Sequence, residues 1–219
     1  MTASTRQIGD ASYERRRTSI LRAARDAFSR LGFTVATVDD VAERAGIAKG
    51  TLYLYFRSKE EIYLACLLEE VHELMRRSRE EMEAKPDLRS KLEAYFRVRF
   101  EFCEKHEAFY RIYQAEYSGL FMKGRAIPKE FRALLEQSLD YMTDVMDRAV
   151  KSGEIRKVPA RSAASAVLDM SRGIAEKRLL GFSHLTPSQE IDFLVEFIWQ
   201  GLAPASKQKA KPATKAAHA

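Results

Sequence analysis

Apolar residues recur at three- and four-residue steps along most of the chain, which is the periodicity of amphipathic helices. Glycine and proline fall between these periodic segments, and few stretches alternate as strands do, so the pattern predicts an all-α fold of about nine helices. The first segment covers residues 14–31 and precedes Gly32, which suits a helix end because glycine adopts left-handed conformations at little cost. Its apolar stripe comprises Ile20, Leu21, Ala24, Ala27, Phe28 and Leu31.

Two short helices are predicted next, over residues 38–45 and 49–56. Thr37, with Asp40 three positions later, forms a weak capping box at the start of the first helix. Gly46 then separates the two helices.

The later helices are longer. Ser58 and Glu61 form a capping box, and Thr186 and Gln189 form another, with Pro187 suited to the first turn of the last helix. The predicted ranges are 59–84, 87–105, 106–122, 128–152, 159–181 and 187–202.

The composition is that of a soluble globular protein, with 46% hydrophobic and 31% charged residues among 219. No apolar run is long enough to span a bilayer, and residues 1–10 lack the apolar segment of a secretory signal, so we expect a cytoplasmic protein without a membrane partner. Cys66 and Cys103 do not indicate a disulfide framework.

The net charge of +6 is concentrated at the two ends of the chain. Residues 1–60 and 203–219 each carry a net +4, whereas residues 61–202 carry −2. A basic amino-terminal region is the expected footprint of polyanion contact, although a modest excess is also common on ordinary surfaces.

Residues 37–57, TVDDVAERAGIAKGTLYLYFR, join the two short helices through a glycine turn. This is the helix-turn-helix arrangement, in which the second helix enters the DNA major groove. Leu52 and Phe56 would pack inward, and an ordinary helical hairpin with exposed tyrosines remains the alternative. The residues left near the exposed start and outer face of the second helix are Lys49, Gly50, Thr51, Tyr53, Leu54 and Tyr55.

These side chains suit different parts of DNA. Gly50 allows a close approach to the groove, and Lys49 and Thr51 carry donors for base edges. Groups suited to phosphate oxygens are the hydroxyls of Tyr53 and Tyr55 and two residues at helix ends, Thr37 and Lys59. The run Arg15, Arg16 and Arg17, with Arg6 further out, can follow the DNA backbone, enter the minor groove or remain solvated.

Residues 17–68 resemble the amino-terminal domain of the tetracycline-repressor (TetR) family, through ILRAARDAFSRLGF, TVDDVAERAGIAKGTLYLYF and RSKEEIYLACL in the family's order and spacing. Ala48 departs from the family's pattern, in which many members have a serine that caps the recognition helix, and this loss costs ~1 kcal/mol. The resemblance implies that phosphates are bound by Thr37, Tyr53, Tyr55 and Lys59, and that Lys49, Gly50, Thr51 and Leu54 face bases.

The resulting domain organisation has four parts. We predict a flexible arm over residues 1–13, a DNA-binding domain over 14–60, a helical ligand-binding and dimerisation domain over 61–202, and a disordered basic tail over 203–219.

Residues 95–121 hold nine of the 22 aromatic residues of the chain. Packing explains most of them, yet this is more aromatic surface than one core face needs, so a core and a largely apolar ligand pocket both remain open. The family resemblance places an effector pocket in these middle helices, with the candidates Phe96, Phe100, Phe109, Tyr110, Tyr113 and Tyr117.

The last predicted helix is apolar around nearly its whole circumference and must be covered on both sides. The helix before it is rich in small residues, so the pair fits either a twofold four-helix dimer interface or a central helix buried in one chain. The resemblance favours a homodimer, with the candidate interface residues Val167, Met170, Ile174, Leu194, Ile198 and Trp199.

The sequence lacks a GxSxG elbow, a Walker phosphate loop and an HExxH zinc pair, so we predict no enzyme activity, catalytic residue, metal or cofactor. We predict a ligand-responsive regulator, a repressor by the family's commonest mode, that binds a palindromic DNA operator as a homodimer. A small, largely hydrophobic effector would release it by favouring another conformer. The competing hypothesis is a helical hydrophobe-binding protein whose helix-turn-helix no longer reads DNA.

Overall fold

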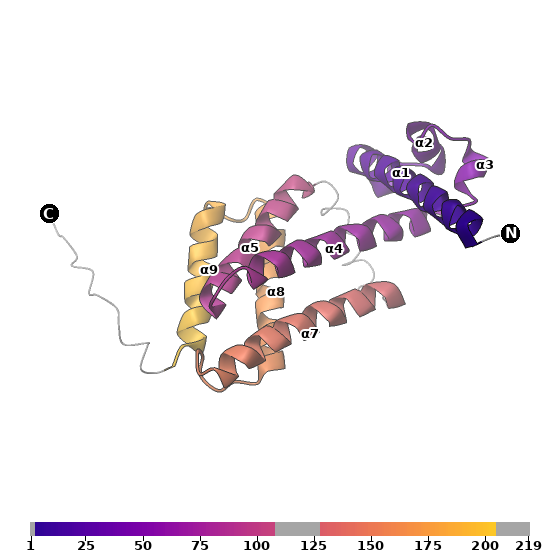
Figure 1. Cartoon of the computed structure of the whole chain (residues 1–219). Coiled ribbons are helices and arrows are strands. Elements are labelled where there is room, and N and C mark those ends of the chain that lie inside the picture. Colours follow the sequence, from indigo (N-terminus) through magenta and orange to yellow (C-terminus); the bar gives the residue numbers. More distant parts are fainter. Residues whose placement is uncertain (1–2, 108–127, 205–219) are drawn as a thin grey trace. The chain divides into compact units, whose positions relative to one another are not determined.

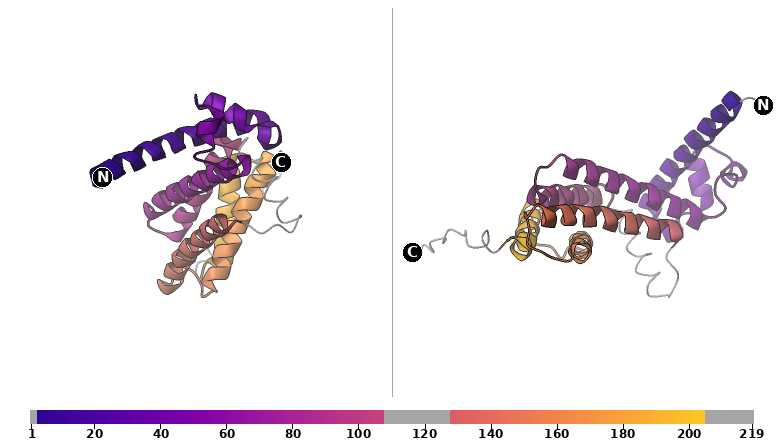
Figure 2. Two further views of the ribbon diagram at one scale, coloured as in Figure 1. Left: turned by 90° about the vertical axis from the view of Figure 1, so that its right-hand side faces the viewer. Right: turned by 60° about the horizontal axis from the view of Figure 1, so that its bottom comes forward.

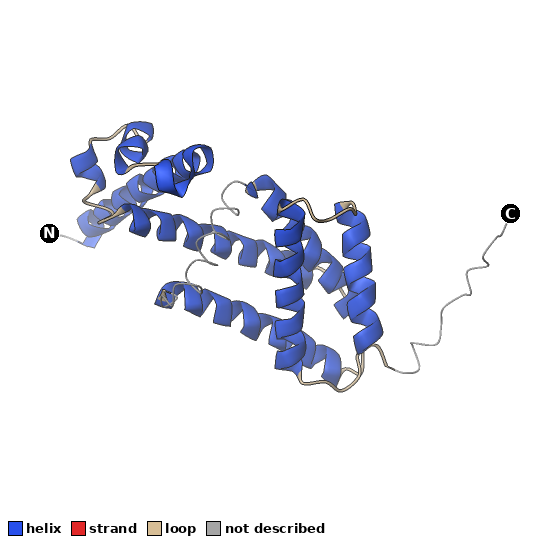
Figure 3. Ribbon diagram, turned by 180° about the vertical axis from the view of Figure 1, so that it is seen from behind, coloured by secondary structure: helices blue, strands red, loops and turns tan. Residues whose placement is uncertain are grey.

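The computed structural model describes residues 3–107 and 128–204, with side chains from residue 12 onward. All regular structure within these ranges is helical, and the predicted all-α fold is confirmed (Figures 1 and 3). None of these helices is both long and apolar enough to cross a membrane. The helices are α1 (Ala3–Val35), α2 (Val38–Arg44), α3 (Lys49–Leu52), α4 (Lys59–Glu83), α5 (Leu88–Lys105), α7 (Lys129–Lys151), α8 (Ala160–Leu179) and α9 (Pro187–Leu202).

The described residues form two compact units. The N-terminal unit contains residues 3–73, 105–107 and 128–132, and the C-terminal unit contains residues 74–104 and 133–204. The division therefore falls within α4, between Glu73 and Leu74, whereas the sequence led us to expect it at residues 60 and 61.

In the N-terminal unit, α1 to α3 and the first part of α4 surround one apolar core (Figure 1). Gly32 interrupts α1 at φ 77, as its position after the apolar stripe predicts. The core comprises Ile20, Leu21, Ala24, Ala27, Phe28, Ala36, Val41, Ala42, Leu52, Phe56, Ile62, Tyr63, Ala65 and Cys66.

The beginning of α1 differs from the prediction, because residues 3–13 are helical and not a flexible arm. This segment contains no proline, and an isolated Gly9 costs a helix only about 1 kcal/mol, so nothing in the sequence stops the helix before Ala3. Periodicity did not predict this helical segment because residues 3–13 lack an apolar stripe. A helix needs such a stripe only where it packs against other residues.

In the C-terminal unit, α5, α7, α8, α9 and the second part of α4 enclose a larger core, and their paths can be followed in Figure 2. Tyr95 and Ser171 share a buried hydrogen bond of 3.1 Å, which links α5 to α8. The side chains at the centre of this core include Met82, Leu88, Leu92, Phe96, Met142, Met146, Ala164, Val167 and Leu194.

The polar signals at helix starts are largely confirmed. Complete capping boxes are formed by Thr37 with Asp40 and by Thr186 with Gln189. At the start of α4 only half of the box forms, because Ser58 accepts from the Glu61 amide at 3.2 Å while the Glu61 carboxylate accepts from the amide of Arg57. The predicted helix over residues 106–122 and most of the predicted tail over 203–219 lie outside the described residues.

Candidate functional site

The helix-turn-helix is built from α2, a turn at Gly46 and α3. Gly46 adopts a φ of 64, which reverses the chain between the two helices. Leu52 and Phe56 are buried in the core of the N-terminal unit, at 0% and 2% exposure, and they fix the orientation of the second helix.

The second helix is shorter than the predicted range 49–56. α3 ends at Leu52, and the chain continues through tight turns in which the amides of Leu54 and Tyr55 donate to the carbonyls three residues earlier. Ala48 stands at the N-cap without a side-chain hydrogen bond, as predicted, so the helix begins without the usual cap.

The outer face of this segment is open to solvent. Lys49 and Gly50 are exposed, and Tyr53 and Leu54 keep 46% and 76% of their surface accessible. Thr51 and Tyr55 are half-buried. Six of the eight predicted DNA-binding residues thus lie on one short segment. Leu54 is apolar yet open to solvent, so it has no packing role among the described residues.

Lys49 forms an exposed ion pair with Asp39 of α2, with its Nζ 2.8 Å from the carboxylate. The hydrogen bond and charge of Asp39 raise the pKa of Lys49 above its ordinary value, so the ammonium is fully charged at neutral pH. Because exposed pairs contribute little stability, the lysine can exchange this carboxylate for another acceptor.

Thr37 is exposed and serves as the N-cap of α2. Its hydroxyl donates to Asp40 at 2.6 Å, and its backbone amide donates to the same carboxylate at 2.8 Å. These hydrogen bonds hold the pKa of Asp40 below its ordinary value. The hydroxyl therefore stabilises α2 in the free protein.

Lys59, predicted to bind a phosphate, binds backbone carbonyls in the protein without DNA. Its ammonium donates to the carbonyls of Phe33, Thr34 and Ala36 at 2.7, 3.4 and 3.0 Å, and it lies 4.6 Å from the centre of the Phe33 ring. An ammonium has three protons, and all of them are donated here to carbonyls that the end of α1 leaves without helical partners. In this structure none remains for the predicted phosphate contact.

The comparisons with known proteins agree with this geometry. The family model described as "Bacterial regulatory proteins, tetR family" matches residues 20–66. The transcriptional repressor KstR2 of Mycobacterium tuberculosis is 32% identical over 141 residues, which cover 64% of this chain and 70% of that protein. The chain belongs to the TetR family.

Two other matches extend over more of the chain. The transcriptional activator FasR of Mycolicibacterium smegmatis is 28% identical over 191 residues, or 87% of this chain and 84% of that protein. The structure of FadR from Bacillus subtilis in complex with stearoyl-CoA superimposes with a TM-score of 0.69 at 20% identity, over 84% of this chain and 98% of that one. This TetR-family protein is accordingly a transcriptional regulator that contacts DNA through its helix-turn-helix, and not an enzyme.

The predicted ligand residues are only partly described. Phe96 and Phe100 of α5 are buried, at 0% and 2% exposure. α4 contributes Ser78, a buried side chain whose hydroxyl has no hydrogen-bond partner among the described residues. The remaining candidates, Phe109, Tyr110, Tyr113 and Tyr117, lie outside the described residues. Within residues 3–107 and 128–204, no cluster of acidic, histidine and cysteine side chains could hold a metal ion.

The predicted dimer residues of this regulator face mainly into its own C-terminal unit. Val167, Leu194 and Ile198 are buried in the protomer core, at 5% exposure or less, because they occupy the inner faces of α8 and α9. Little of their surface is therefore left for a partner. Met170, Ile174 and Trp199 are partly buried against the same core.

The apolar surface that α9 does expose was not among the predicted interface residues. Phe193 and Phe197 are 57% and 60% exposed, and their rings stack with centroids 5.9 Å apart. The helix is thus apolar on two sides, and the described residues of the protomer cover only one of them. A central helix buried in one chain is not what the structure shows.

Proposed function

We propose that this TetR-family regulator binds a palindromic DNA operator as a homodimer and acts as a ligand-released repressor. The observation that carries the proposal is the open outer face of residues 49–55, held rigidly by the burial of Leu52 and Phe56. Base edges would be read by Lys49, Thr51 and Leu54, with Gly50 allowing the approach, while Tyr53 and Tyr55 bind phosphates.

A second copy of the chain is the occupant proposed for the exposed side of α9. More than half of the surface of the stacked Phe193 and Phe197 side chains is exposed, and exposing this much apolar surface to water is unfavourable. A twofold axis would cover the pair of each protomer with the pair of the other. Such a dimer would present two recognition segments, residues 49–56 of each protomer, about one DNA turn apart, which requires operator half-sites ~34 Å apart.

The proposed effector is a long-chain acyl-CoA thioester. A largely apolar ligand with one polar end suits a site that combines aromatic rings with a few polar groups. The described groups of this kind are the buried rings of Phe96 and Phe100 on α5 and, on α4, the buried hydroxyl of Ser78, which has no partner among the described residues. The stearoyl-CoA named for the FadR structure supports the same ligand class.

Selection of bound sequences from random duplex DNA, followed by footprinting, tests the proposal. We expect a palindrome with two half-sites about 10 base pairs apart, and affinity that falls steeply between 50 and 200 mM salt. Addition of palmitoyl-CoA is expected to release the selected DNA. An enrichment without twofold symmetry would contradict the homodimer, tighter binding with palmitoyl-CoA would contradict ligand release, and no enrichment would favour the hydrophobe-binding alternative.

The substitution Gly50→Ala separates stability from DNA binding. A β-carbon at position 50 meets nothing within 4 Å in the free protein, and alanine favours a helix over glycine by about 1 kcal/mol. We therefore expect an unchanged or higher melting temperature together with operator binding weakened at least tenfold, because the added methyl group occupies space needed by the DNA. Equal operator affinities of variant and wild type would show that the backbone at Gly50 does not approach the DNA closely.

A further inference from the structure

Two side chains of α1, Tyr13 and Arg17, contact two aromatic residues at the end of the recognition segment. The ring of Tyr13 stacks on that of Tyr55, with centroids 4.7 Å apart and an angle of 23° between the planes. One helical turn later, the guanidinium of Arg17 lies 5.4 Å from the centre of the Phe56 ring. Residues 13 and 17 share one face of α1, so this face holds the two consecutive residues that end the recognition segment.

The Tyr13 contact is not needed to bury a core residue. Tyr13 is itself 43% exposed, and Tyr55 is half-buried, whereas Phe56 is already buried at 2% exposure. What the stacking does is restrict the Tyr55 ring, and with it the direction in which the Tyr55 hydroxyl can donate. It also fixes the part of α1 around Tyr13 beside the surface proposed to bind DNA.

The structure divides the arginine run that precedes the apolar stripe of α1. Arg17 is engaged by the Phe56 ring and by Glu69 of α4, at 3.5 Å. Arg15 and Arg16 are exposed, and no described residue forms a hydrogen bond or ion pair with either. A helix turns by about 100° per residue, so Arg16 lies about 60° from Tyr13 around α1, and Arg15 lies about 160° away.

We propose that Tyr13 is a positioning residue for operator binding and that Arg16 beside it donates to a DNA phosphate. This extends the interface from the helix-turn-helix onto residues 13–16 of α1, next to the phosphate proposed for Tyr55. A guanidinium without an acidic partner, held on the same side of α1 as the stacked tyrosines, has the charge and the donors that a phosphate requires. The inference rests on the proposed operator binding.

Four variants of the full-length protein test it by operator affinity over a range of salt concentrations. We expect Tyr13→Ala to weaken binding about tenfold, and Tyr13→Phe, which keeps the stacking and loses only a hydroxyl, to bind as the wild type does. We expect Arg16→Ala to reduce the slope of log affinity against log salt by about 1.8, the value for two phosphate contacts, one from each protomer of the proposed dimer.

Arg22→Ala is the matched control. Arg22 is also exposed on α1 without a described partner, but it lies about 180° around the helix from Tyr13. It removes the same charge, and we expect it to leave the slope unchanged. Melting curves of all four variants establish that each is folded at the assay temperature.

Two results would overturn the inference. One is that Tyr13→Ala binds the operator as tightly as the wild type. The other is that Arg16→Ala and Arg22→Ala change the salt slope equally, which would mean that the arginines act through general electrostatic attraction. A failure of the proposed function looks different, because the wild-type protein itself would then select no DNA sequence. DNA selection by the wild-type protein therefore distinguishes a failure of this inference from a failure of the proposed function.

Discussion

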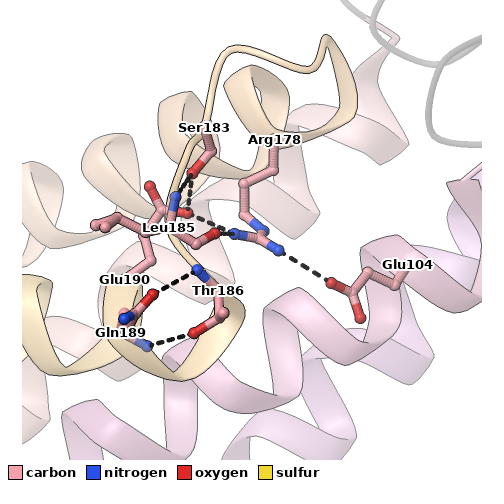
Figure 4. Close-up of polar contacts among 7 residues, drawn as sticks. All are labelled: Glu104, Arg178, Ser183, Leu185, Thr186, Gln189 and Glu190. Atoms are coloured by element: carbon pink, nitrogen blue, oxygen red, sulfur yellow. Dashed lines mark hydrogen bonds and ion pairs between the residues drawn. The ribbon is translucent and has the colours of Figure 1, made fainter.

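Replacing Arg178 by methionine is expected to lower the free energy of unfolding of the C-terminal unit by about 3 kcal/mol, because it leaves a largely buried carboxylate unpaired. The guanidinium of Arg178 bonds to Glu190 of α9 at 2.8 Å and to the carbonyl of Leu185 at 3.0 Å, and it lies 3.3 Å from Glu104 of α5 (Figure 4). The side chains of Arg178 and Glu190 are only 17% and 12% exposed, so solvent screens their interaction weakly. One side chain thereby joins α5, α8, the connection after α8 and the first turn of α9.

The control for Arg178→Met is Arg161→Met in the same helix. Arg161 pairs with Asp140 at 2.6 Å, a shorter distance, but the two side chains are 59% and 64% exposed. Exposed pairs contribute ~0–1 kcal/mol, so this variant is expected to melt within about 3 °C of the wild type, whereas Arg178→Met should melt roughly 10 °C lower. Similar melting temperatures for the two variants would mean that burial does not decide the strength of these pairs.

The helices were predictable wherever apolar periodicity and a polar start signal occur together. Thr186, Pro187 and Gln189 gave the first residue of α9, and the observed helix ends at Leu202 as expected. Periodicity failed where a helix has little to pack against, as in residues 3–13 of α1. It also overestimated α3, because Tyr53, Leu54 and Tyr55 continue the apolar pattern while their backbone forms tight turns.

The chemistry of the DNA-binding segment could be predicted from its residue types, but the contacts that position it could not. The inward burial of Leu52 and the openness of Leu54 follow from local pattern. The stacking of Tyr13 on Tyr55 joins residues far apart in the sequence, so no local pattern records it. Likewise the sequence does not distinguish an exposed lysine from one bound to backbone carbonyls. For that reason Lys49 and Lys59 were both predicted to contact DNA.

The burial of the dimer candidates within the protomer has a related physical reason. A helix that is apolar on two sides does not reveal which side faces its own core. Leu194 and Ile198 were therefore assigned to a partner, yet they complete the protomer core, while Phe193 and Phe197 remain accessible. Only the packing of α9 against the other helices decides between the two sides.

Exchanging Lys59 for methionine is expected to destabilise the N-terminal unit by about 3 kcal/mol, because hydrogen bonds to a charged group contribute ~1.5–3 kcal/mol each and at least two short ones are lost. Methionine keeps the apolar stem of the side chain and removes only the ammonium, so the carbonyls of Phe33 and Ala36 lose their donor without a cavity being formed. The measurement is urea unfolding of the full-length protein without DNA, followed by circular dichroism.

Lys49→Met is the matched control for Lys59→Met, and the two variants are expected to show opposite effects. Lys49 is exposed, and among the described residues its ammonium bonds only to Asp39, so its loss should leave the urea midpoint unchanged and weaken operator binding about tenfold through a lost charged contact. Lys59→Met should lower the urea midpoint strongly. At low temperature, where the variant remains folded, its operator binding should retain the salt slope of the wild type, because no phosphate contact has been removed. A slope reduced by about 1.8 for Lys59→Met, one phosphate contact in each protomer of the proposed dimer, with an unchanged midpoint, would instead make Lys59 a phosphate ligand whose ammonium leaves the end of α1 when DNA binds.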